Sequence, residues 1–144
     1  MIHDIKITPL KIISDKRGKV MHMLRTDTEV FKQFGEVYFS TIFNEAIKGW
    51  HLHKESHLNY TCIKGKVKLV LFDDRDNSPS KNKFQEIILS PENYCLITIP
   101  PNIWNGFKGL DKEESIIANC LTIAHNEKEM IRKDPFDKKF NYQW

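Results

Sequence analysis

Short apolar runs, most of them rich in β-branched and aromatic residues, alternate with polar turns along nearly the whole chain. Runs of this kind, bounded by Gly, Pro, Asn, Asp and Ser, are typical of β-strands rather than helices. The pattern predicts strands at residues 2–13, 19–24, 36–43, 57–63, 67–72, 84–89, 94–99, 104–108 and 115–124. Many short strands with closely spaced turns indicate an all-β sandwich or barrel.

Two segments depart from the strand pattern. Residues 26–34 favour a short helix, because Thr26 or Asp27 can cap it and its apolar residues fall on one face. The charged segment 125–144 contains one predicted helical turn and a closing set of aromatic residues. Neither an internal repeat nor a linker divides the chain, so residues 1–144 are predicted to form a single domain.

Composition and charge narrow the function classes. The chain has 144 residues, of which 40% are hydrophobic and 28% charged, as in ordinary globular domains. A net charge of +3, with basic and acidic residues interleaved, argues against a nucleic-acid partner. Cys62, Cys95 and Cys120 each lie inside an apolar run and are predicted to be buried, reduced thiols. No signal segment or membrane-spanning run is seen, so we expect a cytoplasmic protein without membrane contact.

Candidate chemistry concentrates in residues 48–65, where His51 and His53 are separated by one residue. Side chains at positions i and i+2 of a strand point to the same face, so both imidazoles should enter one cavity. The glycine before this pair, the glycine hairpin after it and a later Pro-led segment resemble the cupin motifs. Metal-binding cupins add a glutamate and a late histidine, and Leu58 and Asn105 stand at those positions. Because transition metals need three or four N, O or S donors, we expect no metal and no other cofactor.

Five further segments carry a more specific resemblance. They are Asp15-Lys16-Arg17-Gly18, Lys48-Gly49-Trp50-His51, the Asp-x-Arg-x-x-Ser-Pro run in residues 72–79, the Leu-Ser-x-x-Asn to Gly-Phe run in residues 89–107, and Asp137 followed by Trp144. In this order and at this spacing they resemble the dTDP-4-dehydrorhamnose 3,5-epimerase family. The resemblance implies a metal-free cupin, a double-stranded β-helix or jelly-roll barrel, that acts on nucleotide-linked sugars as a homodimer with exchanged strands.

The resemblance also implies roles for individual residues. His51 would be the general base that removes a proton next to a 4-keto group, oriented by Asp137 or, as the alternative, by Asp134. Arg17 and Lys48 would meet the nucleotide diphosphate. The remaining predicted substrate contacts are Tyr38, Ser40, His53, Trp104, Asn105 and Asn119.

Two departures from the family pattern keep the reaction open. The family's enolate-stabilising lysine is replaced by Leu58, and its tyrosine acid aligns with Asn119. Residues 48–54 also resemble the Arg-Gly-x-His-Ala-His-Lys motif of dTDP-sugar 3,4-ketoisomerases, in which Tyr38 would line the pocket. We therefore predict a nucleotide-sugar epimerase or isomerase of deoxysugar and cell-surface polysaccharide biosynthesis, acting on a 4-keto-6-deoxy sugar that is linked to dTDP. A 3,4-ketoisomerase, a non-catalytic sugar-nucleotide-binding cupin and a metal-dependent cupin are the alternatives.

Overall fold

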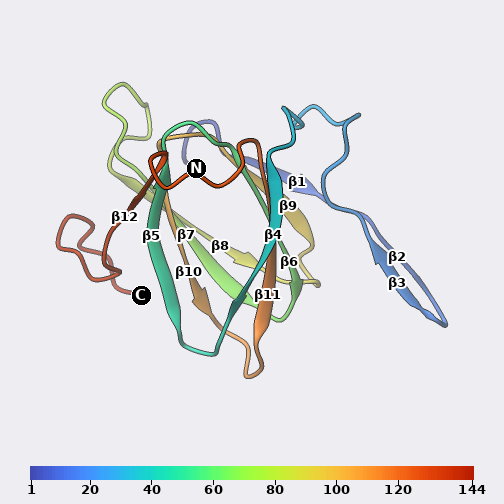
Figure 1. Ribbon diagram of the computed structural model, residues 1–144. Coiled ribbons are helices and arrows are strands. Elements are labelled where there is room, and N and C mark those ends of the chain that lie inside the picture. Colours follow the sequence, from blue (N-terminus) through green and yellow to red (C-terminus); the bar gives the residue numbers. More distant parts are fainter.

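Two five-stranded antiparallel sheets face each other in the computed structural model, which describes residues 1–144 (Figure 1). Sheet 1 has the order β1 (Lys6–Pro9), β9 (Cys95–Ile99), β6 (Leu58–Lys64), β11 (Ser115–Leu121), β4 (Glu36–Ile42). Sheet 2 has the order β12 (Met130–Arg132), β5 (Ile47–His53), β10 (Trp104–Gly109), β7 (Val67–Asp73), β8 (Lys83–Leu89). A separate hairpin, β2 (Ile12–Asp15) and β3 (Gly18–Met21), projects away from the body. The all-β, jelly-roll prediction is confirmed.

Both helix predictions are wrong, because the structure contains no helix. Residues 26–30 form turns and residues 31–34 have no regular structure; Val30 is buried while Phe34 is 66% exposed. An isolated helix this short is marginal unless a whole face packs on something, and here only part of that face does. The tail instead supplies β12, which pairs with β5. No segment of the protein forms a helix long and apolar enough to cross a membrane.

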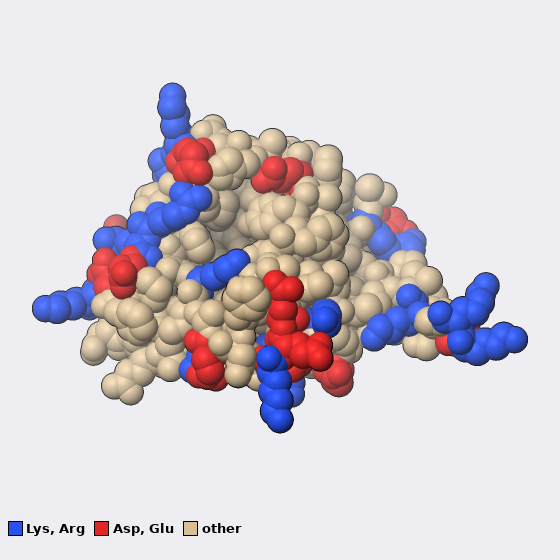
Figure 2. Space-filling model, turned by 60° about the horizontal axis from the view of Figure 1, so that its bottom comes forward, with Lys and Arg blue, Asp and Glu red and all other residues tan.

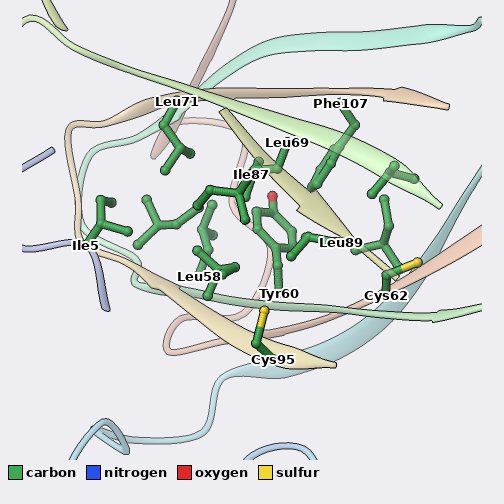
Figure 3. Packing of buried hydrophobic residues seen from close by; sticks show 14 of the residues in the cluster. Ile5, Leu58, Tyr60, Cys62, Leu69, Leu71, Ile87, Leu89, Cys95 and Phe107 are labelled. Carbon is green, nitrogen blue, oxygen red and sulfur yellow. The ribbon is translucent and has the colours of Figure 1, made fainter. Parts of the chain in front are cut away.

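The interior between the two sheets is a single apolar core of 18 buried residues (Figure 3). Strand β6 contributes Leu58, Tyr60 and Cys62 to it, and the alternation of the strand sends Asn59 and Thr61 to the opposite face. Leu58 is 1% exposed and lies among aliphatic neighbours. All three cysteines are buried and unpaired, as predicted.

The glycine hairpin at residues 64–66 is also confirmed. Gly65 joins β6 to β7 and has φ +78°, in the left-handed region that favours glycine. A Cβ at this position would lie 2.3 Å from Ser115 Oγ, so the turn also depends on close packing against β11.

The Asp-x-Arg-x-x-Ser-Pro segment braces the loop between β7 and β8. Asp73 is fully buried and accepts hydrogen bonds from Arg75 (2.9 Å), Ser78 (2.6 Å) and Ser80 (2.7 Å). Burial alone would raise the pKa of Asp73, but these donors outweigh it and hold the pKa well below its usual range. Arg75 also reaches Asp4 at 3.2 Å. This segment of the family resemblance is therefore structural in this chain.

An aromatic cluster covers the outer face of sheet 2. Phe140 from the tail stacks on Trp50 with ring centroids 4.5 Å apart and meets Trp104 edge-on at 5.2 Å. Trp144 lies over Gly106, where a Cβ would come within 2.8 Å of the indole ring. The tail thus covers the face of sheet 2 that points away from the main core. Trp104 packs on this outer face, as part of the aromatic cluster.

We expect Phe140→Ala to lower the free energy of unfolding by about 3–5 kcal/mol, because it removes a large side chain that is only 3% exposed. Phe136→Ala is the matched control, since Phe136 lies in the same tail but is 70% exposed; its cost should stay within about 0.5 kcal/mol. Urea unfolding followed by tryptophan fluorescence measures both values. Equal costs for the two variants would contradict the role given to the aromatic cluster.

Candidate active site

A pocket of about 460 Å³ opens between the two sheets at the β12 end of the barrel. This volume lies within the range of small-molecule sites in proteins. Its lining comes from β4, β5, β6, β11, β12 and the segment before β12, namely Glu36, Tyr38, Ser40, Lys48, His51, His53, Tyr60, Leu121, His125, Met130 and Arg132. A larger groove of about 770 Å³ lies on the outer side of the molecule, along residues 74–79 and Trp104. The smaller pocket is the candidate site because it holds both histidines and two tyrosines.

His51 and His53 both line this pocket, as their spacing on one strand predicts. The His51 ring makes no hydrogen bond to the protein, while its main-chain carbonyl accepts one from Asn105 Nδ2 at 3.1 Å. Burial, followed by the charges of Arg132, His53 and Lys48, lowers the pKa of His51 from 6.5 to about 4. The imidazole is therefore neutral at physiological pH and free to accept a proton.

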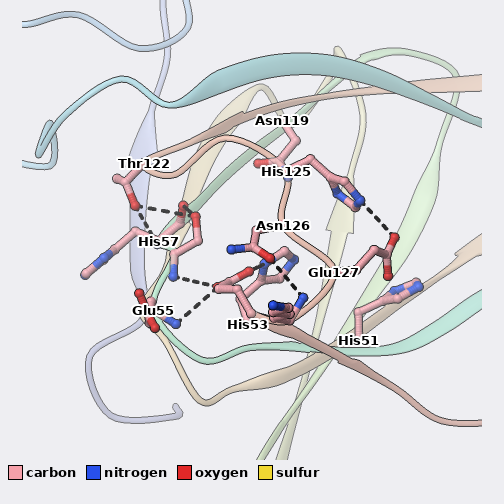
Figure 4. A network of polar contacts seen from close by, with 12 residues as sticks. His51, His53, Glu55, His57, Asn119, Thr122, His125, Asn126 and Glu127 are labelled. Atoms are coloured by element: carbon pink, nitrogen blue, oxygen red, sulfur yellow. Dashed lines mark hydrogen bonds and ion pairs between the residues drawn. The ribbon is translucent and has the colours of Figure 1, made fainter.

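His53 is held by a carboxylate that the sequence patterns did not indicate. Its Nδ1 lies 2.8 Å from Glu129 Oε2, and both side chains are buried (Figure 4). Glu129 Oε1 also accepts the backbone N–H groups of Glu55 (3.1 Å) and Ser56 (2.8 Å). Burial would raise the pKa of Glu129, but these two amides and His53 lower it overall. An ionised Glu129 keeps a proton on Nδ1 of His53 and fixes the orientation of the ring.

Two phenols flank Asn119 across sheet 1. Strand register places Asn119 opposite Tyr38 of β4 on one side and opposite Tyr60 of β6 on the other. Asn119 Nδ2 donates to the Tyr38 hydroxyl at 3.0 Å, and the Tyr60 hydroxyl donates to Asn105 Oδ1 at 3.2 Å. Burial raises the pKa of both tyrosines, so both are protonated at neutral pH. Asn119 thus holds a phenol that the neighbouring strand supplies.

The structure does not bring every predicted site residue to this pocket. Lys48 and Ser40 line it, and Lys48 Nζ donates to Thr41 O at 2.6 Å and to Ser40 Oγ at 3.3 Å. Arg17 instead sits on the β2–β3 hairpin, where it pairs with Asp15.

Asp137 and Trp104 also lie outside the pocket lining. Asp137 pairs with Lys133 at 3.3 Å and accepts the Lys139 N–H, and no hydrogen bond joins it to His51. Trp104 belongs to the outer aromatic cluster. Tyr60, Glu129 and Arg132 are site residues that sequence reasoning missed, because the strand pairing that brings them together has no local signal.

The donor set of the pocket does not suit a metal ion. Of the two positions that complete a cupin metal site, Leu58 belongs to the apolar core and Asn105 is already bonded to Tyr60 and to the His51 carbonyl. No group of three or more His, Cys, Asp or Glu side chains is arranged to hold a metal.

We expect Glu129→Gln to lower the free energy of unfolding at pH 7 by about 1–3 kcal/mol, because it weakens three hydrogen bonds, two of them buried. A lowered carboxyl pKa contributes stability above the ordinary value of 4.5, and that contribution is lost as the pH falls through the folded-state pKa. The difference between the two proteins should therefore shrink on acidification. Chemical unfolding between pH 3 and pH 7 measures it.

Glu113→Gln provides the control for this experiment. Glu113 pairs with Lys64 at 3.4 Å, but its side chain is 77% exposed. Exposed pairs contribute little, so this variant should unfold like the unmodified protein at every pH. A Glu129→Gln difference that grows toward acid would contradict the assigned charge state.

The fold and the pocket together define a cupin with a neutral histidine, a carboxylate-held histidine and two phenols in a cavity without a metal donor set. The whole chain, residues 1–144, matches the family model for dTDP-4-dehydrorhamnose 3,5-epimerase. The chain therefore belongs to the dTDP-4-dehydrorhamnose 3,5-epimerase family, whose members are sugar-nucleotide epimerases, and it is an enzyme of that class.

Individual relatives agree with this assignment. A dTDP sugar isomerase from Desulfovibrio desulfuricans G20 is 32% identical and superposes with a TM-score of 0.96 over 99% of this chain and 92% of that chain. The probable low-salt glycan biosynthesis epimerase Agl13 of Haloferax volcanii is 28% identical over 98% of this chain and 88% of its own length. The dTDP-6-deoxy-D-glucose-3,5-epimerase RmlC of Legionella pneumophila, crystallised with dTDP-4-keto-L-rhamnose, shares the fold at 22% identity and a TM-score of 0.85, over 97% of this chain and 78% of that chain.

Proposed function

We propose that this enzyme epimerises a dTDP-linked 4-keto-6-deoxy sugar by moving a proton at a carbon next to the keto group. The observation that carries the proposal is the placement of a free, neutral His51 on sheet 2 and a protonated Tyr38 on sheet 1, both lining one pocket. Epimerisation needs a base on one face of a carbon and an acid on the other.

The chemistry follows from these two groups. The keto group acidifies the neighbouring C–H bonds, so His51 can take the proton while the electron pair moves onto the keto oxygen and forms an enolate. Tyr38 then gives its hydroxyl proton to the opposite face of the same carbon. His51 ends protonated and Tyr38 ends as a phenolate, and solvent exchange resets both.

The nucleotide and the cellular setting are part of the proposal. The sugar nucleotide held by the Legionella relative supports a dTDP substrate, and Lys48, which lines the pocket, is a candidate to bind its diphosphate. The unpaired, buried cysteines fit a reducing compartment, which agrees with a cytoplasmic enzyme of polysaccharide biosynthesis.

A second candidate is 3,4-ketoisomerisation. It is favoured by the two histidines that lie on the same wall, one of them fixed by Glu129. Two bases on one side of the sugar could move protons between neighbouring carbons and oxygens without inverting a centre. If neither reaction occurs, the remaining alternative is a protein that binds a sugar nucleotide without catalysis.

We expect the enzyme to place deuterium at C3 or C5 of dTDP-4-keto-6-deoxyglucose in D₂O, with the 4-keto group retained. His51→Asn should slow this exchange by about 10²–10⁴-fold, the usual contribution of a general base. Tyr38→Phe should keep the exchange but reduce the yield of inverted product. Tyr142→Phe, on the outer face, is the control, and NMR follows every reaction. A 3-keto product would favour the ketoisomerase, and binding without exchange would leave only the binding protein.

We also propose that two copies of the chain form a homodimer. The edge strand β4 exposes Val37 (50%) and Phe39 (62%), and the β2–β3 hairpin exposes Ile13 (53%) and Val20 (58%). Isolated hairpins and long apolar edges are seldom left uncovered. Figure 2 shows basic side chains gathered on the projecting hairpin, and a partner's pocket is the place where Arg17 could meet a diphosphate.

Light scattering should give twice the mass of one chain, and Phe39→Asp should give the mass of a single chain. Phe136→Asp, at a position that is 70% exposed in the tail, should leave the dimer intact. If Arg17 serves the partner's pocket, Arg17→Gln should weaken dTDP binding without changing the mass. A monomer at tens of micromolar would contradict the proposal.

A further inference from the structure

The proposed reaction places a negative charge on the keto oxygen, and a donor must stabilise it. Preorganised donors at such an oxyanion contribute about 10²–10³-fold in rate. The lysine that the family resemblance assigns to this task is replaced by Leu58, which is 1% exposed in the apolar core. Another cation in the pocket has to be sought.

Arg132 is the cation nearest the proposed base by strand register. It is the last residue of β12, and its Cα pairs directly with that of His51 in β5. Cross-strand partners project on the same face of a sheet, and both residues line the 460 Å³ pocket. The charge of Arg132 lowers the pKa of His51 on one sheet and also acts on the pKa of Tyr38 on the other. The guanidinium therefore lies near both proton-transfer groups.

Glu127 holds the guanidinium group of Arg132 in place but leaves some of its N–H groups without a partner. Arg132 Nη1 and Nη2 lie 2.7 Å and 3.3 Å from the two carboxylate oxygens of Glu127. Figure 4 shows the second contact of this carboxylate, with His125 Nε2 at 2.8 Å. Arg132 and His125 lower the pKa of Glu127 to about 2, so the carboxylate stays charged. A guanidinium has five N–H groups, and this contact occupies two of them. The others remain available to a ligand.

Lys48 is the other candidate, and it fits less well. Its ammonium group donates to the Thr41 carbonyl at 2.6 Å and to Ser40 Oγ at 3.3 Å, which anchors it to β4. Lys48 lies three residues before His51 on the same strand, and its cross-strand partner is Phe107, so it is not the register partner of the proposed base. The planar fork of an arginine also suits an oxyanion that needs two donors at once.

We propose that Arg132 is the oxyanion-stabilising residue, and that Glu127 positions it. When His51 removes the proton, the C–H electron pair moves into the ring C–C bond and the carbonyl π pair moves onto the keto oxygen. That oxygen becomes an enolate and accepts the free N–H groups of Arg132. This inference rests on the proposed function, because it needs the enolate that His51 would generate.

The test compares Arg132→Gln, Arg132→Lys and Glu127→Gln with the unmodified enzyme, by steady-state deuterium incorporation into dTDP-4-keto-6-deoxyglucose. Arg132→Gln should lower kcat by about 10²–10³-fold with KM changed less than about threefold. Arg132→Lys should recover part of kcat, and Glu127→Gln should lower kcat less than Arg132→Gln does. Arg25→Gln is the matched control, since Arg25 forms an equivalent exposed pair with Asp27. Calorimetric binding of dTDP alone should be the same in all variants.

Two results would overturn the inference while leaving the proposed function in place. One is an unchanged kcat for Arg132→Gln in an enzyme that otherwise exchanges deuterium. The other is a loss of dTDP affinity with kcat retained, which would make Arg132 a diphosphate ligand. Failure of the unmodified enzyme to exchange deuterium would remove the proposed function and this inference together. Thermal unfolding of each variant separates these outcomes from misfolding.

Discussion

The pairing of Glu129 with β5 is the contact on which the candidate site depends. Glu129 holds the His53 ring and two backbone N–H groups after β5, and its own carbonyl accepts the Lys54 N–H at 2.9 Å. The next residue, Met130, begins β12 in register with His53. A strand of three residues has little stability of its own. The buried carboxylate therefore fixes the segment that carries His125, Glu127 and Arg132 over the pocket mouth, and it ties the orientation of a histidine to that same segment.

The two family positions that look empty in the sequence do not leave the pocket without the corresponding chemical groups. Asn119 stands where the family has its tyrosine, and it donates to the hydroxyl of Tyr38 on the next strand. Leu58 stands where the family has its lysine but lies in the apolar core, whereas Arg132 brings a cation into the pocket from β12. A pocket built from facing strands can accept a functional group from any of several backbone positions. Loss of a motif residue therefore counts against the reaction only when the surrounding strands also lack a group of the same chemistry.

The sequence predicted the fold better than the site, and the physical reasons are clear. Alternation of apolar residues is a local pattern, so strands such as β6 and β7 could be predicted directly from the sequence. The spacing of His51 and His53 likewise predicted that both rings enter one cavity. The segment at 26–34 has a helical pattern, yet it packs on too little to become a helix. Strand β12 lies in a charged stretch and exists because of its partner β5, so Glu129 and Arg132 carried no signal. Motif spacing selected Arg17 and Asp137, but spacing along the chain does not report which way a hairpin or tail turns.

The charges of the pocket also bear on when His51 becomes a useful base. Burial and the nearby charges of Arg132, His53 and Lys48 hold its pKa at about 4, which keeps it neutral but makes it a weak base. A bound diphosphate would add negative charge near these cations, and an opposite charge nearby favours the protonated imidazole. In the proposed reaction, substrate binding would therefore raise the pKa of His51 toward neutrality. Proton-transfer catalysis works best with a pKa near the operating pH, so the cations that bind and stabilise the substrate would also make the base strong only when the substrate is present.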